Sequence, residues 1–442
     1  MAKMQGANAV SGRHSAGSQS TGSVLTHMPA IDAVRGIAIL LVLVHHFSPE
    51  VSGSTFTRGL LSTLHVGWVG VDLFFVLSGF LITAILLKTR RSEDFFLNFY
   101  ARRTLRIFPL YYIILAVLLL VLPALLHMPL AGQFLQYWFG KVTKDLPAML
   151  DGQSWLWLYG TNLKIAVDGS RWGAVNHFWS LAVEEHFYLA WPLVVYFVSS
   201  RQRLARICLV CIFGAPVLRG MMMLAGFDSV VPYVLTPCRV DSLAIGALIS
   251  ILIAHPQDVI KWQKRFGWMA AGSMAGLLAL PLIYGRFNRD DLLTTTLGYS
   301  LLAVVSAWIV LAAARIRPGT AACRIIANPV FTSLGRYSYG IYVTHMFFTP
   351  VYARLFSWSM LRHYTGSYWI AITINLVLSI ACAWFVAWMS YHVMEKHFLR
   401  LKTLFDYRRP QLVLPSSAPA AKAQKPMILR PGTALQPVRR AA

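Results

Sequence analysis

The sequence predicts an all-α, polytopic membrane protein with about ten transmembrane helices. Of its 442 residues, 57% are apolar and only 13% are charged, and the mean hydropathy is +0.56. Soluble domains carry about 25% charged residues, so this composition excludes the two or three soluble domains that the length alone would allow. Apolar runs of roughly 17–25 residues, enough to cross about 30 Å of hydrocarbon, recur along the chain.

Ten apolar runs are expected to span the membrane. They lie at residues 31–48, 67–87, 107–126, 177–199, 204–225, 239–254, 266–285, 294–314, 329–352 and 369–393. The run at 239–254 is the shortest, so a tilted or half-buried helix is an alternative there. The stretch 131–163 is aromatic but too interrupted to be counted as a further span.

The charges are concentrated in alternate connecting segments. The chain has 40 Lys and Arg against 17 Asp and Glu, a net charge of +23. The basic residues cluster in the segments 88–106, 200–206, 255–265 and 315–328. By the positive-inside rule, these loops and both termini face the cytoplasm. No basic soluble domain is left to bind nucleic acid, so we expect no nucleic-acid partner.

The chain divides into one membrane domain and two tails. Residues 1–30 are rich in Gly, Ser and Ala and lack the apolar core of a signal peptide, so we expect a disordered cytoplasmic tail. Residues 31–400 form the ten-helix membrane domain. Residues 401–442 are basic and are expected to form a second disordered tail near the inner leaflet. Cys208 and Cys211 form a C-x-x-C pair without a second ligand pair, so no metal site is expected.

The first span carries ionisable residues near both of its ends. A charge deep in a span costs about 2.5–3.5 kcal/mol, which makes such residues functional candidates. Arg35 lies near the inner end and His46 near the outer end, roughly 16 Å apart along the helix axis and nearly on one face. Snorkelling of both side chains to the two interfaces is an equally good explanation for this pair taken alone.

The second and fourth spans carry carboxylates. Asp72 lies about a turn and a half into the second span. Glu184 and Glu185 lie about two turns into the fourth, and His177 precedes them. Adjacent helical residues point about 100° apart, so the two glutamates cannot share one face. We expect one of them to orient a catalytic histidine and the other to form a structural pair.

The sixth and ninth spans add further polar residues. Arg239 and Asp241 enter the sixth span from the outer side, where pairing with another span is an equally good explanation. Tyr339, Tyr342 and His345 recur every three residues in the ninth span and form a polar stripe on one helix face, although packing alone can produce such a stripe.

Counting spans predicts one polar chamber in the outer half of the membrane. The residues expected to share it are His46, Asp72, Glu184, Glu185, Asp241 and His345. A second group, formed by Arg35, Arg102, Arg103 and Arg106, is expected to line the inner face. Five spans that independently carry costly polar residues at one depth indicate a site.

These segments resemble the acyltransferase-3 family, which are integral membrane acyltransferases of bacterial type that move acyl groups onto extracytoplasmic carbohydrates. The resemblance covers about residues 30–400, and the matching segments occur in the family's order. They are Arg35-x10-His46, FFVLSGFLIT (74–83), RRTLRIFPLYY (102–112), HFWSLAVEEHFY (177–188), RVDSLAIGAL (239–248), GRYSYGIYVTH (335–345) and YHVMEKHF (391–398).

The resemblance implies roles for individual residues. His46 corresponds to the family's essential histidine and Arg35 to its first-span basic residue. Arg103 and Arg106 correspond to the paired inner arginines, and the motif glutamate falls on Glu184 or Glu185. The sequence departs from the pattern at two positions, where His186 replaces a typical glutamine and His397 an expected proline. The first departure affects acceptor contacts or the environment of the base.

We therefore predict an acyl-CoA-dependent O-acyltransferase of a bacterial-type inner membrane, most simply an O-acetyltransferase. The expected partners are the acyl-CoA donor, an extracytoplasmic carbohydrate acceptor and membrane lipid. Acyl-CoA, most simply acetyl-CoA, is a co-substrate, and no permanently bound cofactor is expected. The inner arginines are expected to bind its phosphates, because a planar guanidinium binds phosphate through two hydrogen bonds. The residues expected to do so are Arg35, Arg102, Arg103 and Arg106.

His46 is the candidate general base, since an imidazole can take up a hydroxyl proton near neutral pH. Glu185, in preference to Glu184, is expected to fix its tautomer. Arg239, Tyr342 or His345 would stabilise the oxyanion. The remaining candidates, expected to support the substrate or the structure of the site, are Asp72, Ser180 and Asp241.

Several alternatives stay open at this point. Direct transfer and a transient acyl-histidine on His46 both fit the residues. A transporter or exporter of an anionic solute would use the same side chains, although we find no inverted repeats of the kind such proteins show. A membrane scaffold for an envelope-assembly complex is the third hypothesis. The sequence does not specify the acceptor glycan, the acyl chain or the oligomeric state.

Overall fold

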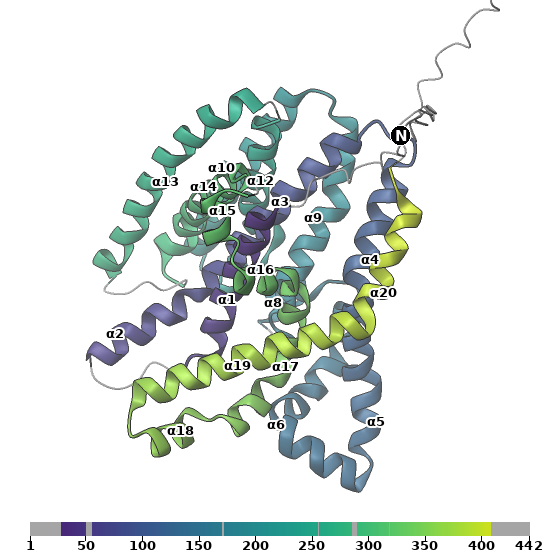
Figure 1. Ribbon diagram of the computed structural model, residues 1–442, viewed down its shortest axis with the longest axis vertical. Helices are drawn as coiled ribbons and strands as arrows, with labels where there is room; N and C mark the ends of the chain where they lie inside the picture. Colours follow the sequence, from purple (N-terminus) through teal and green to yellow (C-terminus); the bar gives the residue numbers. More distant parts are fainter. Residues whose placement is uncertain are drawn as a thin grey trace, which may run out of the picture.

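A computed structural model describes residues 28–49, 55–169, 172–254, 256–284, 290–317 and 319–407. Within these ranges every regular element is a helix (Figure 1). Eight stretches of the described chain are long and apolar enough to cross a membrane. The predicted all-α, polytopic membrane fold is therefore confirmed. Most of the two expected tails, residues 1–27 and 408–442, lies outside the described residues.

The helices follow one another with short connections. In the first half they are α1 (Pro29–Phe47), α2 (Thr55–Leu64), α3 (Val69–Thr89), α4 (Phe95–Ala116), α5 (Leu122–Leu126), α6 (Pro129–Asp151), α7 (Gln153–Trp157), α8 (Thr161–Asp168), α9 (Phe178–Phe197) and α10 (Arg201–Leu224). In the second half they are α11 (Val230–Val234), α12 (Thr236–Leu252), α13 (Pro256–Tyr284), α14 (Tyr299–Arg315), α15 (Ala321–Ile326), α16 (Pro329–Arg336), α17 (Ser338–Leu355), α18 (Trp358–Thr365), α19 (Tyr368–Ser390) and α20 (Lys396–Arg400).

Short helices of other types join or extend these elements. The 3-10 helices are His65–Trp68, Gly173–Val175 and Leu401–Phe405, and the π-helical turns are Val117–Val121, Thr294–Gly298 and Tyr391–Glu395. The turn Val117–Val121 joins α4 and α5, so that residues 95–126 form one candidate span.

Each of the ten predicted spans corresponds to helical structure, but only eight meet the criteria of length and apolarity. The other two are α9 and the region of α16 and α17. They fall short because they carry the polar residues of the candidate site: α9 includes both glutamates, and α17 includes His345 and several tyrosines. The ninth predicted span is also divided at Tyr337, where α16 ends and α17 begins.

Two expected boundaries differ from the structure. The segment 88–106 was expected to be a loop, but α4 begins at Phe95 and includes Arg102, Arg103 and Arg106. No Gly or Pro interrupts this segment before Pro109, so the helix forms despite its charge. The chain also continues in order past residue 400, as the 3-10 helix Leu401–Phe405, which packs against α4.

Glycines bring the central helices together. Gly79 of α3 lies so close to the backbone of α12 that an added Cβ would overlap the carbonyl oxygen of Leu243. In turn, a Cβ at Gly246 of α12 would overlap the carbonyl oxygen of Val76. Small residues at such crossings are a common way to pack membrane helices, because they let two backbones approach. Helix α3 also packs against α1, α9 and α14, and so occupies the centre of the protein.

The helices that carry the candidate residues surround this centre. In Figure 1, α1, α3 and α9 lie in the middle of the molecule, and α4 and α20 lie along one edge. Helix α17 packs against α1, α6 and α19. Side chains from α1, α3, α4, α9 and α17 can therefore reach a common interior region.

Candidate functional site

A cavity with an empty volume of about 740 Å³ lies between α1, α3, α4, α9 and α17. We call it the arginine cavity. Its lining residues are Arg35, Val71, Phe74, Phe75, Leu77, Ser78, Arg103, Arg106, Ile107, Ser180, Leu181, Glu184, Glu185, Tyr188, Ser338, Tyr339 and Tyr342. Eight of these seventeen residues were candidates from the sequence, namely Arg35, Arg103, Arg106, Ser180, Glu184, Glu185, Tyr339 and Tyr342. The structure shows which of them face one another.

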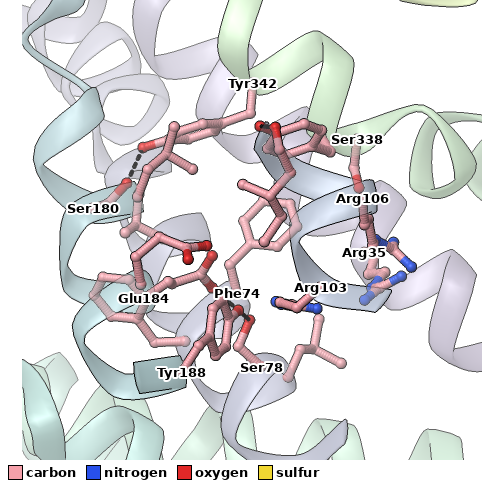
Figure 2. A pocket seen from close by; sticks show the side chains of 17 residues that line it. Arg35, Phe74, Ser78, Arg103, Arg106, Ser180, Glu184, Tyr188, Ser338 and Tyr342 are labelled. Atoms are coloured by element: carbon pink, nitrogen blue, oxygen red, sulfur yellow. Dashed lines mark hydrogen bonds between the residues drawn. The ribbon is translucent and has the colours of Figure 1, made fainter. Parts of the chain in front are cut away.

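Three guanidinium groups form one wall of the arginine cavity. Figure 2 shows Arg35, Arg103 and Arg106 on one side, with Glu184 facing them from the other. Arg106 lies within electrostatic range of both Arg35 and Arg103. The Nε–H of Arg103 is buried and has no hydrogen-bond partner within the described residues. Like charges that are held together with an unused donor suit an anionic ligand.

Tyr188 connects Glu184 with Arg103 through a hydrogen-bonded serine on one side and a cation–π contact on the other. The Ser78 hydroxyl donates a hydrogen bond to Oε1 of Glu184, and the Tyr188 hydroxyl donates to Oγ of Ser78 at 2.9 Å. The guanidinium of Arg103 lies 3.8 Å from the centre of the Tyr188 ring, within the range of a cation–π interaction. Glu185 lines the same cavity. Both glutamates therefore belong to the arginine cavity.

A second cavity, with an empty volume of about 1000 Å³, holds the histidines. We call it the histidine cavity. Its lining residues are Val42, His45, His46, Trp68, Val71, Ile165, Gly173, Asn176, His177, Trp179, Val230, Tyr233, Val234, Tyr342 and Met346. The walls thus combine large aromatic rings with a few polar groups, which is typical of a pocket for an organic ligand.

His46 is held by the backbone of its own helix. Its Nδ1 lies 2.9 Å from the carbonyl oxygen of Val42. Because a carbonyl oxygen only accepts, Nδ1 carries the proton and the lone pair lies on Nε2. The same arrangement is found at His345, whose Nδ1 donates to the carbonyl oxygen of Tyr342 at 2.8 Å. The unprotonated nitrogen of an imidazole is the one that can act as a base.

Three imidazoles lie in edge-on contact. The ring centres of His46 and His345 are 5.0 Å apart, and those of His345 and His177 are 4.9 Å apart. His345 is fully buried, and its Nε2 has no hydrogen-bond partner within the part of the chain that the structure describes. His177 was not among the residues expected to form the site. Its position about two turns before the two glutamates was the available signal.

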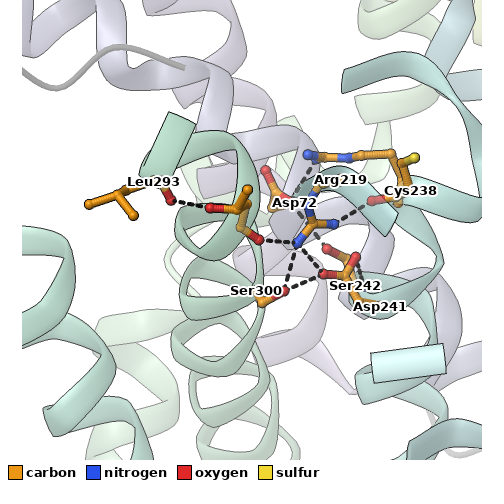
Figure 3. A network of polar contacts seen from close by, with 9 residues as sticks. Asp72, Arg219, Cys238, Asp241, Ser242, Leu293 and Ser300 are labelled. Atoms are coloured by element: carbon orange, nitrogen blue, oxygen red, sulfur yellow. Dashed lines mark hydrogen bonds and ion pairs between the residues drawn. The ribbon is translucent and has the colours of Figure 1, made fainter. Parts of the chain in front are cut away.

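The expectation of one shared outer chamber was wrong. Asp72 and Asp241 line neither cavity; they form ion pairs with buried arginines instead (Figure 3). Asp72 lies 2.7 Å from Arg239, and Asp241 lies 3.0 Å from Arg219. Arg219 was not identified from the sequence, because a single arginine within an otherwise apolar span does not reveal its partner.

The Asp241 network joins three helices. Nη2 of Arg219 also donates to the carbonyl oxygen of Thr296 at 3.0 Å and to Oγ of Ser300 at 2.7 Å. The Ser300 hydroxyl donates to Oδ2 of Asp241 at 2.6 Å. These bonds connect α10, α12 and α14. The network is therefore structural in its geometry, and it satisfies charges that would otherwise be costly to bury.

Three further expected contacts are absent from the described structure. Glu185 and His46 line different cavities, and the carbonyl oxygen of Val42 occupies the position expected for the carboxylate. Arg239 is paired with Asp72 and lines neither cavity, so it does not reach an oxyanion here. Arg102 lines neither cavity and binds the segment after α20 instead. The two remaining oxyanion candidates, Tyr342 and His345, do lie beside His177.

The fold and the two cavities define a class of protein, namely a polytopic helical membrane protein with an interior arginine-lined cavity next to an imidazole-bearing cavity. A family model described as an acyltransferase domain, acyltransferase-3, matches residues 28–388. The chain belongs to this family.

Curated relatives agree with this assignment. A Staphylococcus aureus (strain MSSA476) protein named "Putative O-acetyltransferase SAS0844" is 26% identical over 338 residues, which are 73% of this chain and 50% of the relative. The protein named "O-acetyltransferase OatA" of Staphylococcus aureus (strain NCTC 8325 / PS 47) is 24% identical over 336 residues, 72% of this chain and 50% of the relative. The chain thus spans about half the length of the curated relatives it matches. No solved structure matches the chain.

Proposed function

We propose that the protein is a membrane O-acyltransferase, specifically an O-acetyltransferase, that transfers an acyl group from cytoplasmic acyl-CoA to a hydroxyl of an extracytoplasmic carbohydrate. One observation carries the proposal: the arginine cavity and the histidine cavity adjoin, and they share Val71 and Tyr342. A site for an anionic donor thus lies directly beside a site with a base.

The arginine cavity supports a donor that carries phosphate groups. Arg35, Arg103 and Arg106 provide three planar guanidinium groups, whose geometry matches phosphate oxygens. The cavity wall beyond them is largely apolar, with Phe74, Phe75 and Leu77 along α3. A CoA thioester has this chemistry, because its phosphates are followed by a long, mostly uncharged arm. The acetyl group is the simplest cargo, and the names of the relatives support it.

The histidine cavity supports a carbohydrate acceptor. Trp68, Trp179 and Tyr233 offer flat apolar faces, and Asn176 and His177 offer polar groups among them. A sugar ring presents apolar C–H faces and polar hydroxyl edges, so both kinds of wall have a counterpart on it. A few polar groups set into aromatic walls are what fixes the orientation of a ligand in such pockets.

The chemistry would then proceed at the boundary between the cavities. Nε2 of His46 takes the proton from the acceptor hydroxyl, and the hydroxyl oxygen forms a bond to the thioester carbonyl carbon. The carbon–sulfur bond breaks, and CoA leaves as a thiolate that takes up a proton. His345 packs against the imidazole of His46 and keeps it oriented. In the two-step alternative, Nε2 attacks the thioester first, and an acyl group would be found on His46 by mass spectrometry.

The test is acetyl transfer in membranes that contain a His46→Gln variant. Membranes would be supplied with isotopically labelled acetyl-CoA on the cytoplasmic side, and acetylated glycans would be detected by mass spectrometry. We expect transfer to fall by about 10²–10⁴-fold, the range for loss of a general base. His363→Gln is the matched control, because His363 is exposed on α18 and lies outside both cavities. Full transfer by His46→Gln at equal membrane abundance would overturn the proposal, as would solute flux without consumption of acyl-CoA.

The proposed orientation has both termini in the cytoplasm of a bacterial-type inner membrane. The eight apolar spans together with α9 and α17 make an even number, which supports a topology with both ends on one side. The basic segments then face the cytoplasm. Reporter fusions after Tyr407 should report a cytoplasmic location, and fusions after Ser48, at the end of α1, should report the opposite side.

A further inference from the structure

Tyr342 of α17 and Val71 of α3 stand between the two cavities. Among the residues that line either cavity, only these two line both. Tyr342 is 7% exposed and Val71 is 8% exposed. Their side chains therefore form the wall that separates the arginines and glutamates from the histidines.

The ring of Tyr342 is fixed in place from several sides. Its hydroxyl donates to the carbonyl oxygen of His177 at 3.1 Å and lies 2.5 Å from Oγ of Ser180, as Figure 2 shows for the serine. Its ring centre lies 5.3 Å from that of His177 and 6.3 Å from that of Phe74. A tyrosine that is anchored at its hydroxyl and packed at its ring edges cannot turn without losing several contacts.

This placement constrains the group that can be transferred. If the donor's phosphates bind the arginines and the acceptor hydroxyl is activated by His46, the thioester carbonyl must lie at the boundary between the cavities. A short acyl group then fits between the Tyr342 ring and the Val71 side chain. A chain that does not fit there would project into the histidine cavity, where the acceptor is proposed to bind. Because Tyr342 and Val71 are both buried, a longer acyl chain at this position would have to displace packed side chains, and packed interiors tolerate added volume poorly.

We propose that Tyr342 and Val71 form an acyl aperture that determines the length of the acyl group transferred, admitting acetyl and excluding longer chains. The inference rests on the proposed function and adds a specificity determinant to it. Ser180 and His177 act through Tyr342 and are positioning residues, because their hydrogen bonds hold the Tyr342 side chain between the two cavities.

Variants of Tyr342 distinguish an acyl aperture from an oxyanion donor, because the two roles predict different effects on kcat and on the preference among acyl donors. An oxyanion donor acts through its hydroxyl, so Tyr342→Phe would lower kcat by about 10²–10³-fold with every donor, and the preference among donors would not change. An aperture acts through the ring, so Tyr342→Ala changes the preference among donors and Tyr342→Phe largely keeps it.

The experiment compares kcat/KM for acetyl-, propionyl- and butyryl-CoA with one acceptor preparation. The readout is the ratio of butyryl to acetyl transfer in the parent and in the Tyr342→Ala, Tyr342→Phe and Val71→Ala variants. We expect the ratio to rise by about 10-fold or more in both alanine variants, since one methylene in a fitted pocket is worth roughly that much. Leu311→Ala is the control for general loosening, because Leu311 is fully buried on α14 and lines neither cavity.

Unchanged ratios in both alanine variants, with measurable acetyl transfer, would overturn the aperture while leaving the proposed function in place. If Tyr342→Ala does not fold, the ratio of butyryl to acetyl transfer in Val71→Ala alone tests the aperture. A ratio that rises equally in Leu311→Ala would also overturn it. Absence of acyl transfer by the parent protein from any of the three donors would instead overturn the proposed function, and the aperture with it.

Discussion

Nη2 of Arg239 lies 2.7 Å from Oδ1 of Asp72, and neither side chain is exposed at all. The Ser242 hydroxyl donates to the same carboxylate oxygen at 3.2 Å. The guanidinium of Arg239 lies 4.3 Å from the ring centre of Tyr299 and 5.3 Å from that of Tyr233. Because Tyr233 lines the histidine cavity, this ion pair supports one wall of the site from behind.

Removal of one partner of this pair should destabilise the protein strongly. Asp72→Ala leaves a buried, uncompensated guanidinium, which costs about 3–5 kcal/mol. The measurement is thermal unfolding of the purified protein in detergent, in which we expect a large fall in Tm. The double variant Asp72→Leu, Arg239→Met should lose less stability than the sum of the two single variants. Additive losses would show that the two charges are not coupled.

Substitution of the glycines at the contact between α3 and α12 should disrupt the packing of these two helices. Gly246→Val places branched carbons where the carbonyl oxygen of Val76 lies, so the two helices cannot approach. We expect little monodisperse protein after extraction. Gly272→Val is the matched control, because an added Cβ at Gly272 of α13 meets no atom within 4 Å. Equal recovery of the two variants would contradict the close contact.

The sequence was sufficient to predict the helices but not the division of the polar residues between sites. Apolar runs of the right length identified the spans, and the cost of buried charge identified the candidate residues. Depth along a helix, however, says nothing about which neighbour a side chain faces. Asp72 and Ser78 lie on one helix, yet six residues turn the chain by about 600°. As a result, Asp72 faces α12 and Ser78 faces α9.

The same limit applies to the arginines of α4. Arg102 and Arg103 are adjacent in sequence and look equivalent as phosphate ligands. They point about 100° apart on the helix, so Arg103 enters the arginine cavity and Arg102 binds the C-terminal segment. Only the packing of distant segments decides this, and a single sequence does not contain that information in readable form.

Arg103 should contribute to the binding of the donor more than to the chemical step. Arg103→Ala removes one of three guanidinium groups and the cation–π contact with Tyr188. We expect KM for acetyl-CoA to rise by about 10-fold, the effect of losing roughly 1.4 kcal/mol of binding, with a smaller change in kcat. A donor without its 3′-phosphate would show whether Arg103 binds that group, because the variant would then no longer distinguish the two donors.

Arg201→Ala is the control for the loss of one positive charge, since Arg201 is exposed at the start of α10. It should leave KM for the donor unchanged. An unchanged KM in Arg103→Ala, together with a large fall in kcat, would contradict the assignment and would place Arg103 at the reacting groups instead.

Arg102 of α4 binds the C-terminal segment, residues 401–407. Its Nη1 lies 3.0 Å from the carbonyl oxygen of Lys402, 3.1 Å from that of Phe405 and 2.7 Å from Oδ1 of Asp406. The ammonium of Lys402 lies within electrostatic range of Arg35, Arg103 and Arg106. The match to the family ends at residue 388, and this later segment brings the amino group of Lys402 close to the arginine cluster.

Lys402→Ala should therefore weaken donor binding, and Arg102→Ala should do so indirectly by releasing the segment that carries Lys402. We expect each variant to raise KM for acetyl-CoA by several-fold, roughly 1 kcal/mol, with little effect on kcat. Because the two residues act through one segment, the Arg102→Ala, Lys402→Ala double variant should have the same KM for acetyl-CoA as Arg102→Ala alone. Leu404→Ala is the control, since Leu404 is exposed on the same segment. Additive increases in KM would instead indicate that Arg102 binds the donor directly, as its neighbours on α4 are expected to do.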